Sequence, residues 1–313
     1  MKMRVSLQPT EPAEVALRKI LRQLLEDLRE NIEGILDDNN PESLHDLRVA
    51  VRRTRSALAQ INGVLPPIAV AGFRSEFKWL GAMTGPLRDL DVLWSDMAVP
   101  SRSQPDHFVD LDPLLPLVES ARQEAFEKVT AALTSPRFDT LLGNWSTFLD
   151  QETPIGGKPR NAATPILELA SKRILKAHTK VLRRGKEAGE EPSTQALHRL
   201  RIDTKKLRYL LEFFRSLYPE VHIAQLVKEL KRFQDILGAV NDTAVQQEIL
   251  TLFAGDLVVQ GPSSLEARAA VDRLAVILAD RQREYVQVFA HRFASFAAET
   301  SRARCQTLFA SSG

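Results

Sequence analysis

Hydrophobic positions recur at helical spacing along most of this chain, and proline and glycine residues separate the periodic stretches. In residues 43–61, for example, Leu44, Leu47, Val51 and Leu58 fall on one side of a helical wheel. The breaks delimit predicted helices at residues 12–36, 43–61, 66–84, 86–98, 112–134, 136–150, 164–188, 193–216, 219–237 and 239–253, with two more from 263 to the end. No stretch is a convincing strand. The pattern therefore predicts an all-α protein.

The same order of segments occurs twice, on either side of a proline- and glycine-bearing linker at residues 151–163. A shift of 153 residues aligns LHDLRV at 44–49 with LHRLRI at 197–202. The register continues without a gap over about 45 positions, which chance matches do not maintain across two helices and a turn. The sequence thus predicts an internal duplication, with halves at 10–150 and 164–310 forming two four-helix-type bundles about a pseudo-two-fold axis.

Composition narrows the class of protein further. The 313 residues are 44% hydrophobic and only 6% aromatic, which suits a helical core better than a β-sandwich. The single cysteine, Cys305, excludes a disulfide framework and a cysteine-based zinc site. We find neither a secretory signal nor an apolar run long enough to span a membrane, so we expect a cytoplasmic protein that does not contact membranes.

The net charge of +2 conceals a separation of charge along the chain. Residues 23–46 hold eight acids and one arginine, whereas residues 171–209 hold twelve lysines and arginines and four acids. On a wheel of about 100° per residue, His45, Arg48, Arg52 and Arg55 fill an arc of about 80°. The second copy repeats this row, and the helix before it carries another at i, i+3, i+7 and i+10.

Like charges at this spacing repel by a few tenths of a kcal/mol per pair, and stability alone would favour interleaved acids. The repeated rows therefore indicate a polyanionic partner, the alternative being an ordinary solvated helix face. Arg53 and Lys206 lie off the rows. His45 and His198, at the heads of the rows, are equally consistent with a ligand contact and with a hydrogen bond inside the bundle.

At these residues the sequence resembles the CHAD family, the conserved histidine α-helical domain. The resemblance is carried by LHDLRVAVRRTR at 44–55, LRDLDV at 87–92, LHRLRI at 197–202 and KKLRYLLE at 205–212. It implies two helical bundles around a central basic surface that binds inorganic polyphosphate without hydrolysing it, with no cofactor and no metal. It also implies association with polyphosphate granules. Many relatives carry a triphosphate-tunnel (CYTH) domain first, for which we expect no room here.

Periodicity, duplication and resemblance together give one set of candidate polyphosphate-binding residues. The set is His45, Arg48, Arg52, Arg53, Arg55, Lys78, Arg173, Lys176, Lys180, Arg183, His198, Arg201, Lys205, Lys206, Arg208 and Lys231, with Arg18 and Arg22 as weaker members. We expect the rows to converge on one channel or groove, extended by the matched pair Lys78 and Lys231. Asp203 is expected to be harmless, since it points away from its row.

Three rival functions remain open. His45-Asp46 looks like the HD pair of metal phosphohydrolases, but the repeat has His198-Arg199, so the acid is not retained there. Asp89 and Asp242, two other candidate metal ligands, suit structural roles better. A nucleic-acid binder would share the phosphate charge, yet the rows lack interleaved aromatic residues, so nucleic acid is expected only as a weaker competitor. A structural scaffold would need an acidic protein to cover the basic surface.

Overall fold

The computed structural model describes residues 3–37, 40–98, 112–151, 159–190, 192–260, 265–297 and 299–310. Within these ranges the chain is all-α, as predicted, and its only strand-like feature is an isolated bridge between Pro12 and Pro165. None of the described helices combines the length and the apolar character needed to cross a bilayer.

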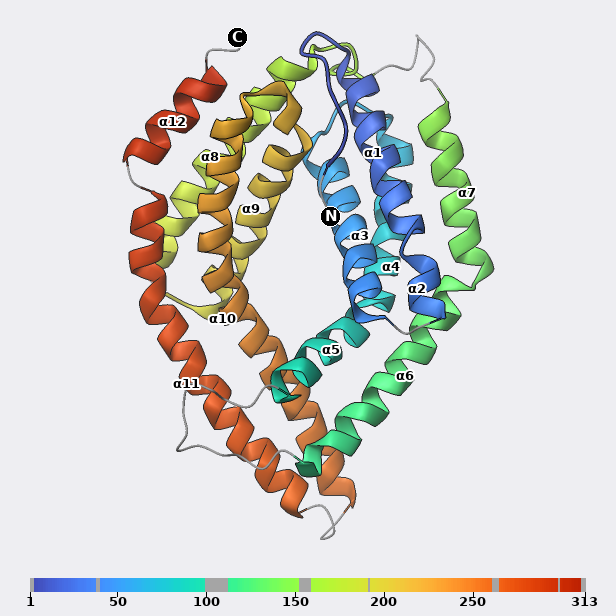
Figure 1. Ribbon diagram of the computed structural model, residues 1–313, viewed down its shortest axis with the longest axis vertical. Helices are drawn as coiled ribbons and strands as arrows, with labels where there is room; N and C mark the ends of the chain where they lie inside the picture. Colours follow the sequence, from blue (N-terminus) through green and yellow to red (C-terminus); the bar gives the residue numbers. More distant parts are fainter. Residues whose placement is uncertain are drawn as a thin grey trace.

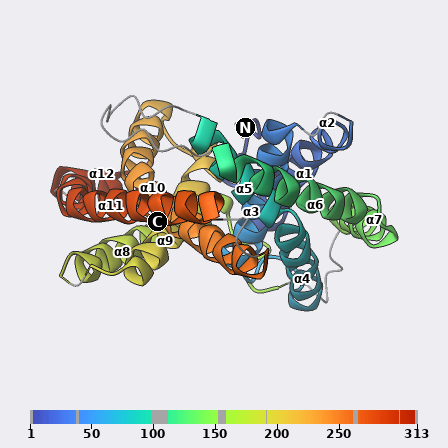
Figure 2. The ribbon, with the colours of Figure 1, turned by 90° about the horizontal axis from the view of Figure 1, so that it is seen from below.

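The helices form two groups that lie side by side (Figure 1). The first comprises α1 (Ala13–Arg29), α2 (Ile32–Leu36), α3 (Pro41–Gln60), α4 (Pro67–Met83), α5 (Gly85–Ala98), α6 (Leu115–Leu133) and α7 (Pro136–Asp150). The second comprises α8 (Ile166–Glu190), α9 (Thr194–Phe213), α10 (Glu220–Gln260), α11 (Leu265–Phe296) and α12 (Glu299–Ala310). Viewed from below, α4 lies at the edge of the molecule (Figure 2). The duplication and its boundaries stay predictions.

The two helices with the repeated basic rows begin at side-chain caps. The Asn40 side chain accepts hydrogen bonds from the backbone N–H groups of Glu42 and Ser43, and Pro41 opens α3. The Ser193 hydroxyl accepts from the Ala196 N–H at the start of α9. Each cap satisfies donors that the first helical turn leaves free, which fixes where each basic row begins.

Two predicted boundaries differ from the structure. The predicted helix 12–36 is two helices, α1 and α2, and the predicted pair 219–237 and 239–253 is the single helix α10. In the first half, α4 ends at Thr84 and a new helix starts, because Pro86 has no N–H to continue the hydrogen-bond ladder. The aligned position in the second half is Ala239, which propagates a helix, so Gly238 alone does not break α10.

Each group has its own aromatic core. Trp145 is fully buried, and its ring centroid lies 4.6 Å from that of Phe73 and 5.3 Å from that of Phe77. In the second group Phe233 stacks on Phe296 at 5.2 Å. A Cβ at Gly185 would lie 1.9 Å from the Phe293 ring, so only glycine allows α8 and α11 to approach this closely. These cores hold each helix group rigid behind the surface where the groups meet.

Contacts between the groups position that surface. The buried Arg53 side chain of α3 forms an ion pair with Glu212 of α9, and Gln60 donates to the Lys206 carbonyl oxygen at 3.1 Å. At the other side, Gln246 of α10 donates to Asp96 of α5 at 2.5 Å. These contacts join the groups on both sides of the surface between them.

Candidate functional site

A cleft of about 1070 Å³ lies where α3, α4, α5, α9 and α10 meet. We call it the basic cleft, because the charged and histidine side chains that line it are His45, Arg48, Arg52, Arg55, Arg74, Lys78, Arg88, Asp89, His198, Arg201, Lys205, Lys206 and Asp242. Nine lysines and arginines oppose two aspartates, which leaves an excess of seven positive charges with the histidines neutral. Such a concentration within low-dielectric walls attracts anions.

The middles of the two basic rows interact across the basic cleft. Burial, together with the positive charges of Arg201 and Arg52, lowers the pKa of Lys205 to about 7 against the pull of Asp242. Burial also lowers the pKa of Arg201, with Arg52 again contributing. Arg52 thus belongs to α3 but acts on the row of α9, which places both rows around one space.

Charged groups also surround the residues at the head of the α3 row. Burial lowers the pKa of His45, and Arg88 and Arg52 add to the effect. Burial lowers the pKa of Arg48 to about 10, although Asp89 opposes the shift. The pKa of Asp89 is raised by burial, against the attraction of Arg48, and the Asp242 carboxylate raises it further. The two aspartates are therefore close enough to repel each other.

Hydrogen bonds fix the orientation of several of these side chains. Arg48 donates to the Gly81 carbonyl oxygen and to the Thr84 hydroxyl, both at 3.1 Å. In the second row, His198 Nδ1 lies 2.8 Å from Asn241 Oδ1, and Arg201 lies 3.4 Å from Asp242. Each row is thus anchored near its head, whereas Arg52 and Lys205 form no ion pair with any described residue.

Buried donors in the basic cleft lack acceptors. The Nε atoms of Arg48, Arg52 and Arg201 are buried, and no described residue accepts a hydrogen bond from them. An unmet buried donor costs free energy, more so when it carries charge. The excess of positive charge, rather than these inaccessible Nε atoms, suits the cleft to a negatively charged ligand.

Comparison with known proteins identifies the family. The model of the CHAD domain matches residues 19–251, most of the chain. This chain belongs to the CHAD family.

Solved structures and a curated protein are also similar to this chain. The crystal structure of the CHAD domain from the plant Ricinus communis superposes with a TM-score of 0.69 and 27% identity, covering 98% of this chain and 96% of that one. PptA from Streptomyces chartreusis shares the fold, with a TM-score of 0.58, 17% identity, and coverage of 91% and 98%. An uncharacterised Mycobacterium tuberculosis protein, Rv2226, is 26% identical over 67% of this chain, which spans 40% of that protein.

The CHAD domain brings half of the candidate residues to the basic cleft. They are His45, Arg48, Arg52, Arg55, Lys78, His198, Arg201, Lys205 and Lys206. The expected convergence does not hold for the rest of the set, which do not line the cleft: Arg18, Arg22, Arg53, Arg173, Lys176, Lys180, Arg183, Arg208 and Lys231. The candidate residues that line the basic cleft come from α3 and α9, except Lys78, which comes from α4.

Most of the outlying cations already have partners. Arg53 and Arg208 both reach Glu212, Arg208 at 3.8 Å. Arg18 pairs with Glu14 at 3.0 Å, and Arg22 pairs with Asp150 at 3.1 Å. Charge neutralisation inside the fold therefore explains why these side chains do not reach the cleft.

Most basic side chains of the row on α8 also have partners within the fold. Lys180 pairs with Asp203 at 3.0 Å, Arg183 pairs with Glu187 at 2.9 Å, and Arg173 donates to Asn62 at 2.6 Å. Lys176 is exposed, as is Lys231, so Lys231 does not extend the cleft as its match Lys78 does.

Two lining cations and one counter-ion have roles that the sequence did not indicate. Arg74 and Arg88 line the basic cleft without belonging to a row, although Arg74 lies one turn before Lys78 on α4. Asp203 is 3% exposed and lies within 4 Å of Lys180, Arg184 and Lys206. Far from being merely harmless, it joins the basic side chains of α8 and α9. Among the described residues, no group of three His, Cys, Asp or Glu side chains is arranged to hold a metal.

Proposed function

We propose that this CHAD domain binds inorganic polyphosphate in the basic cleft and releases it unchanged. The observation that carries the proposal is the excess of seven positive charges around a single cleft, whose lysines and arginines come from four helices, α3, α4, α5 and α9. A polyphosphate chain offers a regular series of anionic oxygens, which guanidinium and ammonium groups bind through charge-assisted hydrogen bonds.

The uncompensated groups support a ligand of this kind. Arg52 and Lys205 lie mid-row without an acidic partner among the described residues. Phosphate oxygens would supply the missing negative charge. Asp89 and Asp242 hold neighbouring arginines at the heads of the rows, which leaves the middle of each row for the ligand.

Nucleic acid would bind more weakly in this proposal, because the cleft offers little for bases to stack on. Its one aromatic lining residue, Tyr209, is 4% exposed. The guanidinium groups of Arg53 and Arg208 lie 5.7 Å and 5.5 Å from the Tyr209 ring centroid. Base stacking needs an accessible aromatic face, so contacts with nucleic acid would reach only the phosphates.

We place the protein in the cytoplasm, with polyphosphate granules as its partner.

Binding without turnover fits the partners of the two histidines. His198 is held by Asn241, and the depressed pKa of His45 keeps its ring neutral near pH 7. A neutral imidazole positions an anion without adding charge.

A salt titration tests the proposal. Binding of long polyphosphate and of single-stranded DNA with equal charge is measured from 50 to 500 mM KCl, with phosphate release followed in the presence of Mg²⁺ or Mn²⁺. We expect polyphosphate to bind more tightly at every salt concentration, with no phosphate released. Equal affinity for the DNA, or sustained phosphate release that His45→Ala abolishes, would overturn the proposal.

A further inference from the structure

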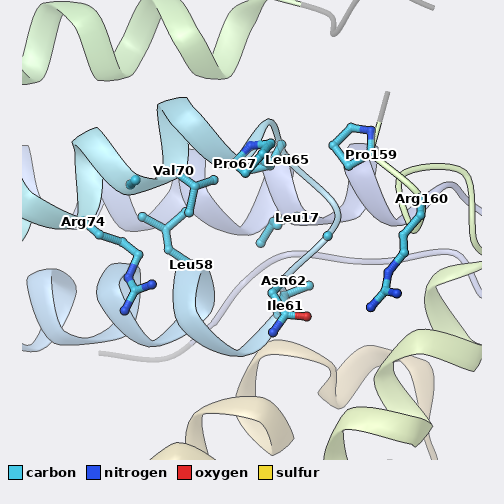
Figure 3. Close-up of a pocket in the computed structure, with 12 residues that line it drawn as sticks. Leu17, Leu58, Ile61, Asn62, Leu65, Pro67, Val70, Arg74, Pro159 and Arg160 are labelled. Carbon is cyan, nitrogen blue, oxygen red and sulfur yellow. The ribbon is translucent and has the colours of Figure 1, made fainter. Parts of the chain in front are cut away.

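A second depression, about 440 Å³ in volume, lies beside the basic cleft and shares Ala71 and Arg74 with it. We call it the α4 groove. It is bounded by α1, the end of α3, the turn at 62–65, the first half of α4 and residues 159–160. Arg74 and Arg160 lie at its two ends, with Leu17, Leu58 and Val70 between them (Figure 3).

The floor of the α4 groove is apolar. Leu17, Leu58 and Leu65 are at most 3% exposed, so they belong to the core but present an edge to the depression. Water gains few hydrogen bonds on such a floor, and apolar side chains that replace it gain free energy in proportion to the area buried.

The start of α4 extends this apolar surface beyond the groove. No charged residue occurs from 64 to 73, and Ile68 is 89% exposed. Of the seventeen residues in α4, only Phe77 and Leu80 are buried. An apolar helix that buries so little against its own fold, at the edge of the molecule, has the character of an interaction surface (Figure 2).

The charges at the ends of the α4 groove restrict what it can bind. None of the described residues lining the groove is acidic, and neither Arg74 nor Arg160 forms an ion pair within the described chain. Arg160 also lies near Arg173, since burial and the Arg160 guanidinium together lower the pKa of Arg173. Both ends of the groove therefore carry uncompensated positive charge.

We propose that the α4 groove docks an acidic peptide segment of a partner protein, with apolar side chains on Leu58 and Val70 and carboxylates at Arg74 and Arg160. A polyphosphate chain is a poor occupant, because an apolar floor cannot replace the water around its charges. A wholly apolar segment would leave both guanidinium groups unpaired. A single short peptide buries less surface than the partners of a stable complex, so we expect a transient contact with micromolar affinity.

Three labelled ten-residue peptides test this proposal by fluorescence anisotropy with the full chain. Each has Leu, Phe and Leu at its centre, and the peptides differ only in having two Glu, two Gln or two Lys residues at each end. We expect the Glu peptide to bind with micromolar affinity, at least tenfold more tightly than the Gln peptide. Equal affinity for all three peptides, or no binding of the Glu peptide, would overturn the proposal.

Variants locate the binding. Arg160→Glu removes a charge that is exposed and outside the basic cleft, so it should weaken the Glu peptide at least tenfold without changing polyphosphate binding. Val70→Asp should also weaken binding of the Glu peptide, because it places a charge on the apolar lining of the groove. Lys128→Glu, on the exposed face of α6, should have no effect. Unchanged peptide affinity in Arg160→Glu contradicts the proposal. So does a dimer that Arg160→Glu dissociates, because the occupant would then be a second copy of the chain.

Discussion

Arg53 of α3 and Glu212 of α9 form a buried ion pair that joins the two helix groups behind the basic cleft. Tyr209 packs beside it, with the Arg53 guanidinium 5.7 Å from the ring centroid. The pair lies one helical position away from Arg52, which lines the cleft. The same short segment of α3 thus provides both a structural tie and a candidate ligand contact.

Arg53→Ala should lower the free energy of unfolding by about 3 kcal/mol, because it leaves the half-buried Glu212 carboxylate with the more distant Arg208 as its remaining ion-pair partner among the described residues. Urea unfolding followed by circular dichroism measures the effect. The double variant Arg53→Ala with Glu212→Ala should cost less than the two single variants added together. An additive result would show that the pair is not coupled.

Neutralising Arg52 and Lys205 together, as Arg52→Gln with Lys205→Gln, should weaken polyphosphate binding without changing the helical content. Two fewer phosphates are neutralised, so the slope of log affinity against log salt should flatten by about 1.4 to 1.8, by analogy with nucleic acids. The measurement is a salt titration at pH 6, where Lys205 is charged. Lys176→Gln, an exposed change outside the cleft, is the matched control. A parental slope in the double variant would contradict the model.

Polyphosphate affinity should rise as the pH falls through about 7. The pKa of Lys205 is about 7 in the free protein, and a bound polyanion favours the charged ammonium, so binding takes up a proton. One proton gives at most a tenfold change per pH unit. Calorimetry in two buffers of different ionisation enthalpy measures the uptake near pH 7.5. Lys205→Arg should abolish this contribution; uptake unchanged in that variant would assign the proton elsewhere.

Lys205→Met should stabilise the empty domain at pH 6 and much less at pH 10. Burial lowers the pKa of Lys205 from 10.5 to about 7, so the folded state disfavours the charge. The unfolded chain holds more protons between these values, so this penalty is fully present below pH 7 and is relieved as the pH rises toward 10.5. Unfolding free energies at both pH values measure the difference. A gain that does not depend on pH would show that Lys205 is not desolvated as described.

The sequence predicted the rows of α3 and α9 well, because helical periodicity fixes which side chains share a face and the same spacing of basic residues occurs at two places in the sequence. It could not show what each face meets. Lys180 lies in an equally regular row on α8, yet it pairs with Asp203 of α9 at 3.0 Å, a contact that requires the tertiary packing. Arg88 was missed for the opposite reason, since it joins the cleft from α5 without belonging to any row.

The contacts Arg53–Glu212 and Gln246–Asp96 between the helix groups also affect the energy of the empty cleft. They prevent the groups from spreading apart to relax the repulsion among nine lysines and arginines. The basic cleft is thus preorganised, because the unfavourable energy of bringing its cations together is met when the protein folds. An anion that binds does not have to reorganise the cleft. If the cleft binds them as proposed, multivalent anions in the buffer should raise the melting temperature of the domain, each in proportion to the logarithm of one plus the ratio of its free concentration to its Kd.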